Sequence, residues 1–452
     1  MVASFWLDSP AVTRPSLTEH IDADLVIVGA GFTGLWTAIA VSDREPGMRV
    51  VVLEAQHVGH GGSGRNGGFV EASLTHGLAN GVARFPDEID ELLRLGHENL
   101  SDLIAFVERH RIACHLERSG AIDVATAGWQ IADLEEDARL HARFAQPVEL
   151  LDAAALREQV VSPTFLGGLA RADTAIVHPG ELARGLAGVV AGRGIALHEH
   201  TPVTALRRNG AGVQVMTPRG GVRAERAVLA TNAYSHRLLR RTGRHYVPIH
   251  DYILLTAPLT PEQRSRIGWA NRQGLADSAN QFHYFRLTHD DRILWGGYDA
   301  IYRYGNGIGA RHDHRRATYD LLARHFRATF PQLGDVRFDR WWGGPIATTT
   351  RFTPVFGDAL GGRVLYALGY TGLGVAATRF AARVLSDRML APSSPLLRLR
   401  FTTADPFPFP PEPFRWASVQ MTRRAIARAD RREGRRGPWL RLLDHFGVGL
   451  DS

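Results

Sequence analysis

The stretch DLVIVGAGFTGLWTAIAV, residues 24–41, decides the fold of this chain. Residues 24–29 form a short apolar run rich in β-branched side chains, which is typical of a buried parallel strand. A glycine-containing turn follows at 29–34, and residues 35–41 continue as an apolar helix. Residues 50–54, VVVLE, predict a second buried strand. The segment is therefore expected to form a strand–helix–strand unit with a right-handed crossover.

The turn GAGFTG carries the spacing of a dinucleotide-binding motif. Gly29 permits a tight turn, Gly31 lets a phosphate approach the backbone, and Gly34 lets the helix pack closely on the strand. The N-terminus of the helix offers unpaired N–H groups to a pyrophosphate. Glu54 ends the second strand about 20 residues after Gly34, where a carboxylate that binds the ribose belongs. The alternative is a structural turn without a ligand, and we favour the dinucleotide site.

A second glycine-rich loop, GHGGSGRNGG at residues 59–68, follows directly. Such a backbone allows close approach to a ligand, and Ser63, Arg65 and Asn66 add donors. A domain that binds only a nicotinamide dinucleotide has no need of this second loop, so the loop favours FAD. The alternative interpretation is a surface loop without a ligand.

Several segments in the same order resemble the D-amino acid oxidase-like flavoproteins, which include sarcosine and glycine oxidases. Besides the two loops and Glu54, they are ATNAYS at 230–235, WWGGPIATTTRFTPVFG at 341–357 and GYTGLGV at 369–375. The resemblance covers most of residues 20–390 and is nearest to the γ-glutamylputrescine oxidoreductases. It implies FAD as the cofactor and oxidation of the C–N bond of a primary or secondary amine by hydride transfer to flavin N5.

The resemblance also implies where the remote parts of FAD bind. Backbone groups at Val203 are expected at the adenine, and the turn at 369–375 is expected at the pyrimidine edge of the flavin, where a helix N-terminus stabilises reduced flavin. The candidate cofactor-binding residues are Gly29, Gly31, Phe32, Thr33, Gly34, Glu54, Ala55, Gly62, Ser63, Arg65, Asn66, Gly67, Gly68, Val203, Thr231, Gly344, Ile346, Gly369, Thr371, Gly372, Leu373 and Gly374.

The substrate side departs from the glycine oxidase-like pattern. Ile346 occupies the position where such relatives carry an arginine that clamps the substrate carboxylate, and isoleucine cannot do so. The sequence therefore favours an amine without an adjacent carboxylate. The alternatives are an amino-acid oxidase with a relocated arginine, for which Arg351 and Arg286 are candidates, and a flavoenzyme that acts on a modified RNA base. A redox-inactive flavin-binding protein is a third possibility.

The candidate catalytic residues are His250, Tyr252 and His283, on predicted strands of the substrate domain. All 53 basic Lys and Arg positions are arginine, so no lysine can form a Schiff base or assist O₂. The electron acceptor is accordingly left open between O₂ and another molecule.

We expect an α/β Rossmann-like FAD-binding domain with an interleaved antiparallel-sheet substrate domain and a C-terminal helical tail. The FAD-binding domain is assigned to 20–85, 150–245 and 340–395, the substrate domain to 86–149 and 246–339, and a Pro-rich, Arg-rich extension to 396–452. Helices are predicted at about 87–111, 182–190, 317–330 and 372–390, strands at 195–199 and 202–206, and glycine-rich turns between 330 and 363.

Composition indicates an ordinary soluble protein, with 44% hydrophobic and 22% charged residues and no apolar run long enough to span a membrane. We expect a cytoplasmic location, no metal, and a single cysteine, Cys114, buried in a strand. The net charge of +7 and the arginines after 415 admit nucleic-acid binding. We favour instead an amphipathic helix packed on the flavin domain, and we do not expect nucleic acid as a partner.

Overall fold

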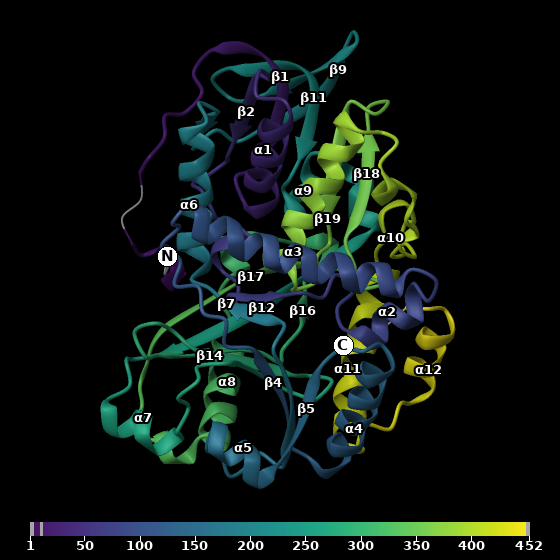
Figure 1. The fold of residues 1–452 in the computed structure, drawn as a ribbon. Coiled ribbons are helices and arrows are strands. Elements are labelled where there is room, and N and C mark those ends of the chain that lie inside the picture. The colour runs from purple at the N-terminus through teal and green to yellow at the C-terminus, as the bar shows by residue number, and fades with distance from the viewer. Residues whose placement is uncertain (1–3, 10–11, 449–452) are drawn as a thin grey trace.

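The computed structural model describes residues 4–9 and 12–448. Figure 1 shows two sheet-based halves, with β1, β11 and β18 in the upper half, β4, β5 and β14 in the lower half, and helix α3 running across the middle. The helices are α1 Phe32–Arg44, α2 Leu78–Arg84, α3 Ile89–Arg109, α4 Gly128–Arg143, α5 Ala153–Gln159, α6 Pro179–Gly192, α7 Pro261–Ile267, α8 Arg316–Thr329, α9 Gly374–Leu390, α10 Arg400–Thr403, α11 Phe414–Asp430 and α12 Pro438–His445.

The upper half is built on an eight-stranded sheet in the order β18-β19-β11-β1-β2-β8, with β10 paired to β11 and β9 to β10. Its strands are β1 His20–Val28, β2 Val50–Leu53, β8 Ala196–His198, β9 Ala205–Asn209, β10 Gly212–Met216, β11 Gly221–Leu229, β18 Val355–Ala359 and β19 Val364–Leu368. β1 runs parallel to both β2 and β11. All four residues of β2 are buried, as expected for a strand covered on both faces. The predicted strand–helix–strand unit is confirmed.

The lower half is a nine-stranded sheet in the order β16-β12-β15-β14-β13-β4-β6-β5, with β17 on the other side of β12. Its strands are β4 Ala121–Ala125, β5 Val148–Asp152, β6 Gly167–Arg171, β12 Tyr246–Thr256, β13 Gly274–Asp277, β14 His283–Leu287, β15 Ile293–Gly297, β16 Ile301–Tyr302 and β17 Phe338–Thr349. Every pair is antiparallel except β13 with β4. β3 Phe69–Glu71 and β7 Thr174–Ile176 form a separate two-stranded sheet.

Strand β17 corrects one expectation, because residues 338–349 were expected to lie in glycine-rich turns and instead pair with β12 along its length. The glycines of this strand make room for neighbours. A Cβ on Gly343 would lie 2.9 Å from Cε1 of Tyr252, and one on Gly344 would lie 3.1 Å from Cδ of Arg65. Close approach of large side chains, and not a turn, explains these two glycines.

The strands and helices also fall differently from the expected domain division at three places. β6 and the end of β5 lie within the range assigned to the FAD-binding domain but belong to the nine-stranded sheet, as does most of β17. α3 lies within the range assigned to the substrate domain, yet its apolar face joins the same core as α1 and α9. Leu103 of α3, Leu35 of α1 and Phe380 of α9 are buried in that core. Hydrophobic periodicity identifies the helix but not the sheet it covers.

Smaller differences concern individual elements. The helices predicted at 87–111, 182–190, 317–330 and 372–390 correspond to α3, α6, α8 and α9. The strand predicted at 202–206 is wrong, because β9 begins only at Ala205. Cys114 is buried as expected, but it lies in a bend and not in a strand.

The C-terminal extension begins on the flavin half, where Phe401 of α10 is buried in the core of α1 and α9, but its helices α11 and α12 pack over the substrate half instead of the flavin half. The carboxylate of Asp430 accepts hydrogen bonds from the backbone N–H groups of Asn280 (3.0 Å) and Gln281 (3.0 Å). The extended proline-rich segment before α11 is held by the N–H of Phe409, which donates to the carbonyl of Arg244. In the described part of the chain, no helix has the length and apolar character needed to cross a membrane.

Candidate functional site

A cavity of about 2070 Å³ connects the two halves of the molecule. Its walls come from the turn at 29–34, the loop at 60–67, β12, β17 and the turn at 370–375. Residues of α11 and α12 add a further wall, so the C-terminal extension takes part in the site.

The first wall is the glycine turn between β1 and α1. Gly29 has φ of +108°, and a Cβ there would lie 2.9 Å from the carbonyl oxygen of Ala230. A Cβ on Gly31 would lie 2.9 Å from Oγ of Ser63, and one on Gly34 would collide with the carbonyl oxygen of Gly29. Gly29 therefore permits the turn and Gly34 permits close helix packing, whereas the missing side chain of Gly31 leaves room for Ser63. The approach of a phosphate to Gly31 stays a prediction. Phe32 and Thr33, which follow Gly31, also line the cavity.

Glu54 stands at the end of β2 and lines the same wall, together with Ala55. Its carboxylate accepts hydrogen bonds from the N–H of Ala30 (2.8 Å) and of Gln56 (2.9 Å). Burial raises the pKa of this carboxyl. Val203 and Thr231 line the cavity as well, so the expected adenine and ribose end is assembled from separate segments.

The glycine-rich loop at 62–68 is closed by its own side chains. The amide of Asn66 donates to the carbonyls of Gly62 and Ser63 and accepts from the N–H of Gly68. Oγ of Ser63 accepts from the N–H of Phe32 at 2.9 Å. Asn66 and Ser63 therefore brace the loop, and its backbone provides the surface that a ligand would approach.

Arg65 in this loop faces the substrate half. Its guanidinium donates to Asp313 at 2.6 Å and to the carbonyl of Gly343 at 3.0 Å. Gly67 lies under a ring, because a Cβ there would be 2.8 Å from Cε2 of Tyr284. These contacts join the loop to β14 and β17.

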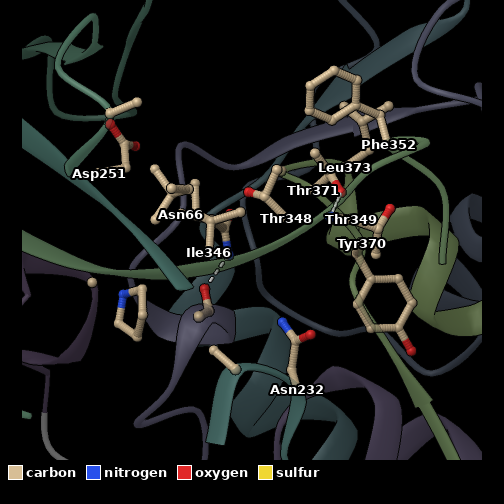
Figure 2. A pocket seen from close by; sticks show the side chains of 18 of the residues that line it. Asn66, Asn232, Asp251, Ile346, Thr348, Thr349, Phe352, Tyr370, Thr371 and Leu373 are labelled. Atoms are coloured by element: carbon tan, nitrogen blue, oxygen red, sulfur yellow. Dashed lines mark hydrogen bonds between the residues drawn. The ribbon is translucent and has the colours of Figure 1, made fainter. Parts of the chain in front are cut away.

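The turn before α9 forms the opposite wall. Gly369, Thr371 and Gly372 have φ of +80°, +50° and +100°, and a Cβ on Gly372 would meet nothing within 4 Å. Leu373 and Gly374 follow at the start of α9, and both line the cavity. In Figure 2, Thr371 and Leu373 lie on one side of the cavity, with Ile346 and Asn66 in view between them and Asp251.

The three candidate catalytic residues have different surroundings, although His250 and Tyr252 are two residues apart on β12. His250 lines the cavity with both ring nitrogens lacking a hydrogen-bond partner among the described residues, and burial lowers its pKa to about 4. Tyr252 packs in the core of the nine-stranded sheet, and its hydroxyl donates to the carbonyl of His312 at 2.8 Å. His283 is buried between Asp277, 2.5 Å from its Nδ1, and His325, 2.9 Å from its Nε2. The residues that line the cavity do not include Tyr252 or His283.

The neighbouring positions are occupied by Asp251, which the sequence analysis did not single out, and by Tyr284. Asp251 and Tyr284 line the cavity, and the hydroxyl of Tyr284 donates to Oδ2 of Asp251 at 2.5 Å. Asp251 precedes Tyr252 and Tyr284 follows His283, and successive residues of a strand point to opposite faces. The strands were identified correctly, but a sequence without the partner strands does not show which face meets the cavity.

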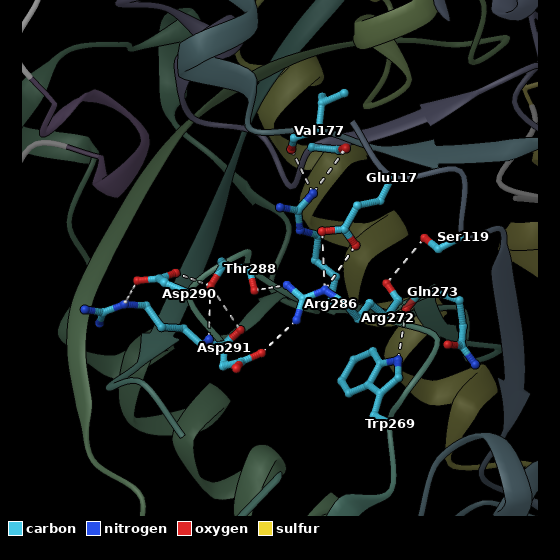
Figure 3. Close-up of polar contacts among 12 residues, drawn as sticks. Glu117, Ser119, Val177, Trp269, Arg272, Gln273, Arg286, Thr288, Asp290 and Asp291 are labelled. Atoms are coloured by element: carbon cyan, nitrogen blue, oxygen red, sulfur yellow. Dashed lines mark hydrogen bonds and ion pairs between the residues drawn. The ribbon is translucent and has the colours of Figure 1, made fainter. Parts of the chain in front are cut away.

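The arginines proposed as relocated carboxylate clamps are engaged elsewhere. Arg286 donates to the carbonyl of Val177 at 2.8 Å, next to the Arg272 ion pair with Glu117 (Figure 3). Burial lowers the pKa of Arg286 to about 9. Arg351 donates to the carbonyls of Pro354 (2.7 Å) and Ala404 (2.6 Å) and so anchors the extension. Both lie outside the set of residues that line the cavity.

Arginines that do line the cavity already have partners among the described residues. They are Arg65 with Asp313, Arg171 with Asp123, Arg237 with the carbonyl of Ile308, Arg423 with Asp299, and Arg436 with Asp444. Ile346 presents an apolar side chain to the same space. Across the described ranges, no group of three or more His, Cys, Asp or Glu side chains is placed to hold a metal ion.

Comparison with known proteins agrees with this geometry. The family described as DAO, FAD dependent oxidoreductase, matches residues 24–388. γ-Glutamylputrescine oxidoreductase of Escherichia coli (strain K12) is 32% identical over 385 residues, 82% of this chain and 84% of that protein. A probable oxidoreductase OrdL of Haemophilus influenzae is 28% identical over 86% of this chain and 88% of its own. The fold is similar to that of glycine oxidase from Geobacillus kaustophilus, with a TM-score of 0.69 at 20% identity, covering 82% of this chain and 98% of that one.

Proposed function

The chain belongs to the DAO family of FAD-dependent oxidoreductases, and we propose that it oxidises the C–N bond of a primary or secondary amine. FAD is its cofactor. When bound, FAD accepts a hydride from the carbon next to the nitrogen. The composition of the cavity wall supports an amine as the substrate. Ile346 is apolar, and each arginine of the wall already has a carboxylate or carbonyl partner, so none of them is open to a substrate carboxylate.

The residues that would hold FAD form three groups. The turn at 29–34 would bind the pyrophosphate through its N–H groups, because its glycines leave the backbone open. Glu54 would bind the ribose and the backbone at Val203 the adenine. The loop at 62–68 and the turn at 369–374 would flank the flavin ring, with the positive end of α9 toward its pyrimidine edge.

The protein's own contribution to the reaction is orientation and exclusion of water. The braced loop at 62–68 and the turn at 369–374 hold fixed surfaces on two sides of the cavity. Apolar side chains such as Ile346 and Phe352 line the space between them and limit the access of water. A substrate held there presents its carbon at a defined position, which is the main requirement of this chemistry.

An anaerobic reduction assay tests the proposal. The FAD-loaded protein is mixed with γ-glutamylputrescine, putrescine and a secondary amine, and in parallel with glycine, D-alanine and L-proline. We expect at least one amine, and none of the amino acids, to bleach the visible absorbance of the flavin. Bleaching by the amino acids and by none of the amines would contradict the proposed substrate class. Admission of O₂ to the reduced protein then shows whether O₂ is the acceptor.

An amino-acid oxidase would need a cation that can bind the substrate carboxylate. Each arginine of the cavity wall is already bonded to a carboxylate or a carbonyl of the protein. Arg351 and Arg286 would each have to leave backbone carbonyls in a buried setting, which costs roughly 1–3 kcal/mol per abandoned hydrogen bond. Arg424 and Arg428 of α11 and Arg441 of α12 are exposed, so the surface of the extension does not decide against an RNA base as substrate. Within the cavity, however, Arg423 and Arg436 pair with Asp299 and Asp444 and are not open to a phosphate. We therefore place the amine first.

A further inference from the structure

We propose that Asp251, positioned by Tyr284, binds the ammonium group of the substrate and accepts its proton. This inference rests on the proposed amine oxidation and assigns a catalytic residue to it. An alkylamine is mostly protonated at neutral pH, as a lysine side chain is. It must lose that proton before the nitrogen lone pair can assist hydride departure, so a proton acceptor beside the substrate is useful.

The two side chains form a pair that faces the cavity. The phenol of Tyr284 on β14 donates to Oδ2 of Asp251 on β12 at 2.5 Å, and both residues line the cavity while remaining partly exposed. Their sequence neighbours Tyr252 and His283 are buried on the other side of the sheet. A hydrogen bond to one oxygen holds the carboxylate in one orientation and leaves further lone pairs for a ligand.

The pair lies beside the loop assigned to the flavin. The ring of Tyr284 covers Gly67, where a Cβ would come within 2.8 Å of Cε2. On its other side, Asp251 is in register with Gly344 of β17, which leaves room for the side chain of Arg65. An amine bound by Asp251 would therefore sit next to the backbone at 65–67, on the side of the cavity that meets the cofactor loop.

The charges around Asp251 favour a cation. Among the described residues, Asp251 has no ion-pair partner, and Tyr284 is the side chain that bonds to it. β15 and β17 present Gly297 and Gly344 to it, without side chains. Arg65, which packs against Gly344, is paired with Asp313 at 2.6 Å. His250, the residue before Asp251, has its pKa lowered to about 4, so it is neutral at physiological pH.

Burial raises the pKa of the Asp251 carboxyl to about 6, so it is ionised at neutral pH and is a stronger base than an exposed carboxylate. In the proposed step an N–H bond of the substrate ammonium breaks and an O–H bond forms on Asp251. The electron pair of the broken bond stays on nitrogen. The step moves one proton and changes no oxidation state.

Binding of an unreactive amine tests this role independently of turnover. The probe is 2-methylpentan-2-amine, whose α-carbon carries no hydrogen and cannot be oxidised, and the matched neutral ligand is 2-methylpentan-2-ol. Calorimetry with the FAD-loaded protein measures the Kd of each from pH 5 to pH 8. For wild type we expect the amine to bind more tightly as the pH rises toward 6 and to reach a plateau above it. One proton is expected to be released per amine bound below that pH.

In Asp251→Asn the Kd of the amine should rise at least about tenfold at pH 7.5, lose its pH dependence and release no proton, while the alcohol binds as in wild type. Tyr284→Phe provides a second test, because loss of its hydrogen bond should raise the pKa of Asp251 and shift the midpoint of binding to higher pH. Tyr302→Phe is the matched control, since its phenol bonds to Asn306 and Glu412 outside the cavity.

The inference is overturned if wild type binds no amine at any pH, or if Asp251→Asn binds it with the wild-type affinity and pH profile. It is also overturned if Tyr284→Phe leaves the midpoint unchanged. Failure of the proposed function looks different: pH-dependent binding of the unreactive amine would remain, but no oxidisable amine would bleach the flavin.

Discussion

The glycine turn at 29–34 and the strands β12 and β14, which flank β15, both line the cavity, but they are built on different principles. In the turn the backbone is the working surface, and each glycine is required by a contact that a Cβ would prevent, as at Gly31 beside Ser63. In the strands the side chains are the working surface, and Asp251 and Tyr284 depend on which face of the sheet meets the cavity. The glycines of the turn follow one another closely in the chain, although Gly31 and Gly29 make room for the distant Ser63 and Ala230. The pair of Asp251 and Tyr284 exists only in the assembled sheet.

The largest expected effect comes from filling the turn. Gly31→Val would place a branched side chain against Oγ of Ser63, which lies only 2.9 Å from the first added atom. We expect the affinity for FAD to fall at least about a hundredfold, since the backbone could no longer approach the pyrophosphate. Equilibrium titration of apoprotein with FAD measures this.

Gly47→Ala is the matched control, because a Cβ at that position meets nothing within 4 Å. Retention of FAD by Gly31→Val at wild-type affinity would contradict the assignment of this turn to the cofactor.

A cation placed in the substrate wall should have the next largest effect. Ile346→Arg would bring an additional guanidinium into a cavity that is proposed to receive an ammonium group. We expect the rate of anaerobic flavin reduction by the best amine to fall at least about tenfold, because like charges repel more strongly in a partly desolvated site. Ile346→Leu keeps the volume and should stay close to wild type. An unchanged rate in Ile346→Arg would place the amine elsewhere.

The raised pKa of Asp251 also has a consequence for stability. Its carboxyl has a pKa of about 6 in the folded protein against an ordinary value of 3.8, so the folded state binds the proton more tightly. The contribution of this carboxyl to the free energy of unfolding is therefore fully present below about pH 4, and it is lost as the pH rises through 6. Asp251→Asn should accordingly melt a few degrees higher than wild type at pH 8, with the difference fading toward pH 4. Calorimetric scans across that range check this, and a lower Tm for the variant at pH 8 would argue against a destabilising buried carboxylate.

The smallest effect is expected where a side chain only braces the backbone. Ser63→Ala removes the oxygen that accepts from the N–H of Phe32 but leaves the loop's glycines and the Asn66 bonds in place. We expect the Kd of FAD to rise about threefold, which is the size of one modest hydrogen bond. The same titration as for Gly31→Val measures it. A loss as large as that of Gly31→Val would mean that side chains, and not the backbone, form the cofactor surface.

Prediction from sequence succeeded for elements that are specified by residues close together in the chain. The strand–helix–strand unit, α8 and the flavoprotein family were all identified, because their signals are short-range periodicities and motifs. The membership of β5 and β6 in the nine-stranded sheet was missed, because the sequence of a strand does not show which strand it pairs with. The helix of the C-terminal extension proved to be two helices on the substrate half, held there by a carboxylate at Asp430 that meets Asn280 and Gln281.

By itself, the sequence determined the cofactor class, because the glycine spacing around Gly31 and the carboxylate of Glu54 are short-range signals of the flavoprotein family. Only the tertiary structure decided which strand face meets the cavity. Side chains alternate along a strand, so Asp251 and Tyr252 have opposite surroundings although they are neighbours in the chain. The tertiary structure also decided that the arginines of the cavity are not available to a substrate carboxylate. The ion pair of Arg65 with Asp313 joins residues far apart in sequence and forms only when the two halves pack together.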